Sequence, residues 1–276
     1  MHFLAHRPGA RLLAALAPLL ALCACATQRP EARQWRTLRA EGFTVYHAAG
    51  LGRDGRYVER LAADAFARLT ETFGGNTKTS LGTLAIYVHA QPTADADVGR
   101  AMLRTARRSS ALEAELHLLA PSLHPPDTAT VVGLRFDDAY FAKLLTHEIS
   151  TLFLETVTEE KSSGWTLYDA PSWFVQGYEE YLGLTLASVD TARIWKRYRQ
   201  WAVAASPPLD IAAGARNDYI DGALLVEFLH ARYGAAAVRA LLESPAPTFW
   251  EAFRQTFGSD AKGLERGFGI WLRERR

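Results

Sequence analysis

The chain has 276 residues, of which 49% are hydrophobic and 22% are charged. This composition is typical of a globular protein with a buried core, and it excludes an intrinsically disordered chain. The formal net charge is +1, and no block of basic or acidic residues stands out. Nothing in the sequence therefore indicates nucleic acid as a partner.

Residues 1–24 have the layout of a secretory signal peptide. Arg7 and Arg11 precede the apolar run LLAALAPLLALCACA. This run is shorter than a typical transmembrane helix. Both cysteines of the chain, Cys23 and Cys25, lie in this run. The stretch LCAC (22–25) resembles a bacterial lipobox in which Cys25 is the lipidated residue. An ordinary cleaved signal peptide is the alternative interpretation.

The lipobox interpretation predicts a protein of the bacterial cell envelope, held to a membrane by its N-terminal lipid. Several acyl chains on Cys25 would anchor it firmly, because stable attachment needs more than one chain. Ala26 follows Cys25, so there is no aspartate retention signal at that place, and we expect the outer membrane, facing the periplasm. Residues 25–40 are polar and read as a lipidated tether.

Residues 41–136 combine patterns typical of strands and helices. Alternation of apolar and polar residues predicts strands, and apolar residues at helical spacing predict helices. Residues 128–136 are ambiguous between the two. The predicted elements are strands at 42–48, 81–90 and 111–121 and helices at 56–75 and 94–108.

Residues 137–276 read as mainly helical. Asp137 or Asp138 is a plausible N-cap for a long apolar helix that reaches about residue 160. Pro171 stands at the entry of a second helix. Further helices are predicted at 190–204, 219–233, 235–243, 247–257 and 261–274. The fold class is therefore α+β, with a small α/β portion at 41–136 followed by a helical portion at 137–276.

The first of these helices contains His147-Glu148-Ile149-Ser150-Thr151. In a zinc peptidase the helix reads H-E-x-x-H, because two histidines four residues apart share one face and bind zinc while the glutamate polarises the attacking water. Here Thr151 stands where the second histidine would be. A neutral hydroxyl is a weak zinc ligand.

The second helix begins PSWFVQGYEEY (171–181) and carries a resemblance to a known family. Together with the motif at His147, this stretch is similar to the peptidase-MA-like, gluzincin-type metallopeptidases, which carry P-x-W-L-x-E-G-x-A-E-Y after H-E-x-x-H. The segments at 218–234 and 248–275 also look like this family, as does the strand-helix-strand start with GFTVYHA (42–48) and LAIYVHA (84–90). The resemblance therefore spans about residues 41–274. It implies a zincin-like fold.

The resemblance also implies roles for individual residues. His147 holds the first zinc-ligand position and Glu148 the general-base position. Gln176 replaces the family's zinc-binding glutamate. Glu180 stands at the place of an acid that orients a ligand histidine, and Tyr219 at the place of a tyrosine that stabilises the transition state.

Two of three zinc ligands, at Thr151 and Gln176, are thus replaced. The leading hypothesis is a non-catalytic peptidase homologue with no cofactor, which binds a peptide or protein in its former cleft or uses His147 and Glu148 only to hold two helices together through Glu180 and Gln176. The alternative is an active zinc peptidase with substituted ligands such as Glu155, Glu180 or His117. A further alternative is an envelope scaffold or assembly factor.

Overall fold

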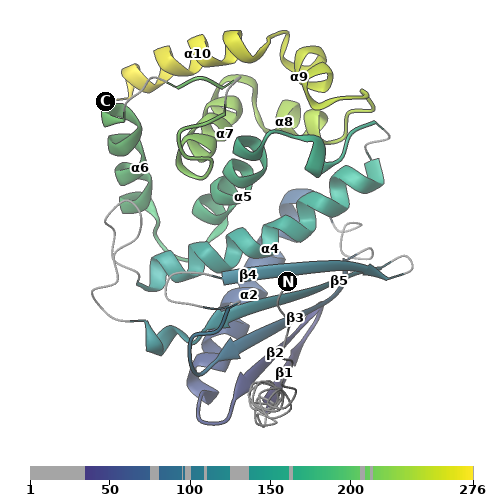
Figure 1. Ribbon diagram of the computed structural model, residues 1–276, viewed down its shortest axis with the longest axis vertical. Coiled ribbons are helices and arrows are strands. Elements are labelled where there is room, and N and C mark those ends of the chain that lie inside the picture. The colour runs from purple at the N-terminus through teal and green to yellow at the C-terminus, as the bar shows by residue number, and fades with distance from the viewer. Residues whose placement is uncertain are drawn as a thin grey trace, which may run out of the picture. The chain divides into compact units, whose positions relative to one another are not determined.

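The computed structural model describes residues 35–74, 81–94, 96, 101–108, 111–124, 137–161, 164–205, 209–211 and 214–275 (Figure 1). The predicted signal peptide, Cys25 and the ambiguous segment 128–136 lie outside these residues. The predicted tether also lies outside them, except for its last six residues.

A five-stranded sheet forms the N-terminal part, with the strands in the order β1-β2-β3-β5-β4. Strands β2, β3 and β5 run parallel to one another, whereas β4 is antiparallel to β5. The predicted strands at 42–48, 81–90 and 111–121 are confirmed as β2, β3 and β5. The bounds are β1 Trp35–Ala40, β2 Phe43–Ala48, β3 Leu81–His89, β4 Ala101–Arg108 and β5 Ala111–Leu119.

Two expectations for this part are wrong. Trp35–Ala40 is strand β1 rather than the end of a tether, and Ala101–Arg108 is strand β4 rather than part of a helix. The residues of β4 are mostly good helix formers, but pairing with Ala111–Leu118 of β5 overrides that local preference. In this register Arg104 lies opposite Glu115, a cross-strand pair of opposite charge that favours the strand.

Helix α2, Gly52–Phe73, packs its apolar face against the sheet. Phe66 of α2 stacks on Phe43 of β2 at 5.2 Å between ring centroids and meets Phe153 edge-on at 5.7 Å. The helix begins earlier than predicted and ends before Gly74, whose φ of 91° is readily adopted by glycine. These aromatic contacts join the sheet portion to the helical portion that follows.

Helix α4, Asp138–Lys161, is the long helix predicted from residue 137. Asp137 is its N-cap, as expected, because its Oδ1 accepts hydrogen bonds from the backbone N–H groups of Ala139 and Tyr140. Phe153 lies in the middle of α4 and is fully buried. The helix runs along the sheet portion on one side and along α5 on the other (Figure 1).

Helices α5, Ser172–Leu186, and α7, Ile220–Tyr233, cross with their backbones in contact. A Cβ on Gly177 of α5 would lie 2.2 Å from the carbonyl carbon of Gly222 on α7, and one on Gly222 would lie 2.2 Å from the Trp173 oxygen. Only glycine fits at such a crossing. Gly183 has the same role toward α4, because a Cβ there would lie 2.8 Å from the Lys143 oxygen.

The remaining helices confirm the predicted order of helices in the C-terminal part. They are α6 Ala192–Ala204, α8 Ala235–Leu242, α9 Phe249–Phe257 and α10 Ala261–Glu274. Two short 3-10 segments are η1, Pro121–Leu123, and η2, Leu167–Asp169. The described residues thus form a five-stranded sheet with a covering helix, followed by a mainly helical portion, as the composition of the two halves predicts.

Candidate functional site

Helix α4 carries a stripe of polar side chains that is largely buried. Lys143, His147, Thr151 and Glu155 are each four residues apart, so they lie along one side of the helix. Lys143, His147 and Glu155 are buried, and Thr151 is half-buried. Buried charged groups need partners, and α5 supplies most of them.

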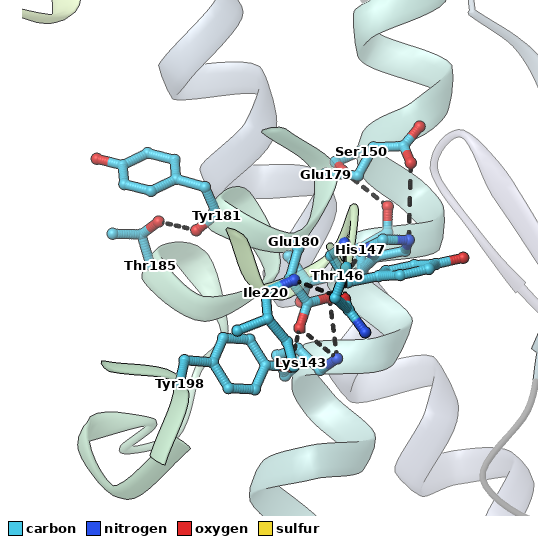
Figure 2. A network of polar contacts seen from close by, with 12 residues as sticks. Lys143, Thr146, His147, Ser150, Glu179, Glu180, Tyr181, Thr185, Tyr198 and Ile220 are labelled. Atoms are coloured by element: carbon cyan, nitrogen blue, oxygen red, sulfur yellow. Dashed lines mark hydrogen bonds and ion pairs between the residues drawn. The ribbon is translucent and has the colours of Figure 1, made fainter. Parts of the chain in front are cut away.

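Glu180 of α5 is the centre of the contacts. It is 1% exposed, and its carboxylate accepts two hydrogen bonds from the Lys143 ammonium, at 2.8 Å and 3.0 Å. The Tyr198 hydroxyl of α6 donates to the same carboxylate at 2.5 Å (Figure 2). Burial alone would raise the pKa of Glu180, but Lys143 and His147 outweigh it and lower that pKa to about 2. Glu180 is therefore a buried carboxylate anion.

His147 lies between two carboxylates of α5. Its Nδ1 is 3.1 Å from Oε2 of Glu180, an ion-pair contact in which the ring N–H is not well aligned with the oxygen. Its Nε2 is 3.6 Å from Oε2 of Glu179. Burial alone would lower the pKa of His147, but the carboxylates around it, Glu180 first, outweigh that effect and raise it. The ring also stacks on Tyr219 at 5.6 Å between centroids.

Glu179 lies beside both metal-ligand positions of the helix motif. It is 2% exposed and contacts Nε2 of His147 at 3.6 Å. Burial raises the pKa of Glu179 to about 7, although His147 and a hydrogen bond with the Thr151 side chain lower it in part. The carboxyl group of Glu179 thus reaches both position 147 and position 151, the two helix positions between which an H-E-x-x-H motif would hold its metal.

Glu148, at the general-base position, is half-buried beside this network. Burial raises the pKa of its carboxyl group, while His147 and Lys143 lower it in part. The exposed Tyr219 stacks on His147, and burial raises the pKa of its phenol, with the charge of Glu148 acting in the same direction.

The structure brings together part of the predicted site. His147 and Glu180 meet as expected, and Tyr219, at the entry of α7, covers His147. Gln176 is half-buried on α5, but the α5 groups that contact His147 are Glu179 and Glu180. The expected partnership of Gln176 with the His147–Glu148 pair is therefore replaced by one with Glu179.

The proposed substitute ligands lie in other clusters. The Glu155 carboxylate accepts a hydrogen bond from the Tyr168 hydroxyl at 2.7 Å. His117, on β5, forms a hydrogen bond with His89 at 3.0 Å and lies 3.6 Å from Glu115. Glu180 is already shared between Lys143, His147 and Tyr198. The contacts of Glu155 and His117 are thus with side chains other than His147.

The sequence reasoning missed Lys143, Glu179 and Tyr198. Lys143 could have been predicted to take part, because a lysine one helical turn before His147 in an apolar stripe must find a buried acid. Glu179 could have been considered as well, because it directly precedes Glu180 in the sequence. Tyr198 had no signal, since its contact depends on where α6 lies relative to α5.

The motif positions themselves supply fewer zinc ligands than a zinc site uses. Structural and catalytic zinc sites use three or four imidazole, thiolate or carboxylate ligands, whereas the motif positions here offer one imidazole, one hydroxyl and one amide. Over the residues that the structure describes, no group of three His, Cys, Asp or Glu side chains is arranged to hold a metal ion. The Lys143 ammonium, moreover, already neutralises Glu180.

Comparison with protein-family models and with curated proteins finds no match to this chain. None of the helices in the described part is both long and apolar enough to cross a membrane.

Proposed function

We propose that this chain is a non-catalytic lipoprotein of the bacterial envelope, with a zincin-like arrangement of α4 and α5 in which the protein's own charged groups take the place of the metal. Its role is to bind a peptide or protein segment rather than to cleave one. The observation that carries the proposal is the place of Glu179, which contacts His147 and Thr151 together.

The contact between His147 and Glu180 supports descent from a zinc-peptidase helix pair. Ligand histidines usually direct their other ring nitrogen at a carboxylate, which fixes the orientation of the ring. Here Nδ1 of His147 lies 3.1 Å from Glu180, and Nε2 is the nitrogen left to face the former metal position. That nitrogen meets Glu179 at 3.6 Å.

Lys143 supports the loss of the metal. Its ammonium is 3% exposed and lies 2.8 Å from Glu180. A divalent cation beside His147 would be close to this permanent positive charge, in surroundings of low dielectric constant where repulsion is strong. The network of Lys143, His147, Glu179, Glu180 and Tyr198 satisfies its buried charges without any ion.

The binding role rests on the groups that remain accessible beside the network. Tyr219 is 47% exposed and its ring stacks on His147, and Glu148, which follows His147 in the sequence, is half-buried. An aromatic ring with an adjacent acid suits the backbone and the basic side chains of a peptide. Anchoring through Cys25 would keep such a binding surface at the membrane.

Metal content after zinc loading and dialysis tests the loss of the metal site. We expect far less than one zinc per chain for the natural protein, and about one per chain for the triple variant Thr151→His, Gln176→Glu, Glu179→Ala, which restores the ligand types and removes the blocking acid. Adding His147→Ala to the triple variant is the matched control and should abolish its zinc.

Stoichiometric zinc in the natural protein that His147→Ala removes would overturn the proposal and favour the active-peptidase alternative. The binding role is tested separately on an array of synthetic decapeptides. We expect Tyr219→Ala to weaken the bound signals and Lys262→Ser, an exposed change on α10, to leave them unchanged. Equal binding by both variants would contradict a binding surface at Tyr219.

A further inference from the structure

A groove between α6 and α10 forms a pocket of about 490 Å³ that shares no residue with the network around Glu180. This volume lies within the range of roughly 300–1,000 Å³ that small-molecule sites occupy. Its apolar lining comes from both helices and from the segment between α6 and α7. The apolar residues are Ala202, Val203, Leu209, Phe268, Ile270 and Leu272.

Two of these apolar side chains remain accessible to solvent. Val203 is 38% exposed on α6, and Ile270 is 52% exposed on α10. Isolated exposed apolar side chains are common, but here both line the same hollow. The groove therefore offers an apolar surface that a ligand with a hydrocarbon part would cover.

Gly269 keeps the groove open. Of the three glycines in α10, Gly263 and Gly267 have close neighbours, because a Cβ would lie 2.2 Å from the Ser259 hydroxyl oxygen and 3.1 Å from the Phe228 ring. A Cβ on Gly269 would meet only the flexible end of Arg273, at 3.7 Å. Glycine in a helix interior is unfavourable relative to alanine, and packing gives no reason for it at position 269, which lines the groove.

Two arginines give the rim of the groove a positive charge. Arg266 and Arg273 line it from α10, both are exposed, and neither forms an ion pair with a described residue. They lie two turns apart, with Ile270 between them on the same side of the helix. Glu265 is the one acid in the lining, so it offsets only part of this charge.

The third arginine of the groove is already neutralised. Arg216 donates from Nε and Nη2 to the two carboxylate oxygens of Asp221, at 3.1 Å and 2.6 Å, and also to the backbone oxygens of Ala202 and Ala205. Its hydrogen-bonding groups are occupied in the folded protein. The cations that face a ligand are therefore Arg266 and Arg273.

We propose that this groove binds an anionic amphiphile, a single acyl chain whose carboxylate or phosphate head pairs with Arg266 or Arg273 while the chain lies over Val203, Gly269 and Ile270. The positive charge of the arginines favours an anionic head group. The apolar lining, which is left open by the glycine at position 269, favours a hydrocarbon chain. The proposal is independent of the role of the α4–α5 site.

Calorimetric titration of the mature chain, from residue 25 on and with Cys25→Ser so that it carries no lipid of its own, tests the proposal. The probes are dodecanoate, dodecyl phosphate and dodecyltrimethylammonium, each below its micelle concentration. We expect one molecule of an anionic probe per chain, and binding of the cationic probe weaker by about tenfold or more, since a charge-assisted hydrogen bond has that effect. Tighter binding of dodecanoate would indicate a fatty acid, and of dodecyl phosphate a phospholipid.

Variants locate the site. Gly269→Leu fills the groove and should weaken anionic binding at least about tenfold, with circular dichroism and melting temperature showing that the fold persists. The pair Arg266→Glu, Arg273→Glu should weaken the anionic probes and not the cationic one. Lys262→Glu reverses a charge on the same helix outside the lining and should have no effect. The proposal would be overturned if the anionic and cationic probes bound equally well, or if a folded Gly269→Leu variant still bound the anionic probes. It would also be overturned if no probe bound.

Discussion

The Lys143 ammonium on α4 donates to both carboxylate oxygens of Glu180 on α5, at 2.8 Å and 3.0 Å, where neither side chain is more than 3% exposed. Two opposite charges are thus buried together between the helices that carry the motif. Such a pair is costly to bury but far more costly to break, since the remaining charge would be left without a partner.

Lys143→Met should therefore destabilise the protein strongly. We expect a loss of about 3–5 kcal/mol in the free energy of unfolding, measured with urea, because Glu180 would keep a buried charge with only His147 and Tyr198 nearby. The control is Arg193→Ala, which breaks the largely exposed pair with Asp137 and should cost about 1 kcal/mol or less.

The double variant Lys143→Met, Glu180→Gln checks the cause. Removing both charges should cost less than the sum of the single changes, since neither charge is then left alone. A Lys143→Met variant no less stable than Arg193→Ala would show that the buried pair does not form.

Tyr198→Phe removes one donor from Glu180 without changing the packing of the ring. Burial and the nearby Glu180 raise the pKa of Tyr198 well above its ordinary value, so the hydroxyl keeps its proton and donates it at 2.5 Å. Hydrogen bonds to charged groups contribute about 1.5–3 kcal/mol, and we expect a loss of that size in urea unfolding. Tyr46→Phe, on the sheet, should change stability by less than about 0.5 kcal/mol; equal effects of the two changes would argue against the contact.

Glu179 should make the protein less stable as the pH rises from about 5 to 8. Its pKa is about 7 in the folded protein and near 4.5 in the unfolded chain, so the folded state holds more protons in this window. Stability associated with this group is fully present below pH 4.5 and is lost as the pH rises through 7. His147, whose pKa is raised, changes stability in the same direction above pH 6.5.

The measurement is urea unfolding at several pH values from 5 to 8. The natural protein should lose up to about 3 kcal/mol across this range, as a shift of one pKa unit corresponds to about 1.4 kcal/mol. Glu179→Gln should flatten the dependence, and Glu71→Gln, an exposed change on α2, should leave it as it is. An unchanged slope in Glu179→Gln would refute the assignment.

Two glycine substitutions should change stability in opposite directions. Gly177→Ala places a methyl group 2.2 Å from the backbone of Gly222, so α5 and α7 must separate, and we expect a loss of at least about 2–3 kcal/mol. Gly269→Ala meets no close atom and should gain about 0.5–1 kcal/mol, because alanine favours the helix. Thermal unfolding of both variants measures this, and a loss in Gly269→Ala would reveal a packing need at α10.

Most elements were predictable because their signals are local. Apolar residues at period two gave β2, β3 and β5, and period 3.6 gave the helices, including α4 with its cap at Asp137. Strand β4 was not predictable in this way. Its residues favour a helix, and only the free edge of β5 beside them makes a strand the better structure.

The candidate site, like the fold, was predictable from the sequence only in part. The positions of His147, Glu148 and Thr151 on one helix, and of Gln176 and Glu180 on another, follow from the sequence alone, since spacing within a helix sets which residues share a face. Which acid meets which ring nitrogen depends on how far the two helices approach and how each is rotated. Gly183 and Gly177 permit that approach to α4 and α7, and it brings Glu179 rather than Gln176 to His147. Only the tertiary structure could decide this, because a buried charge is satisfied by whichever partner the packing of distant segments places within reach.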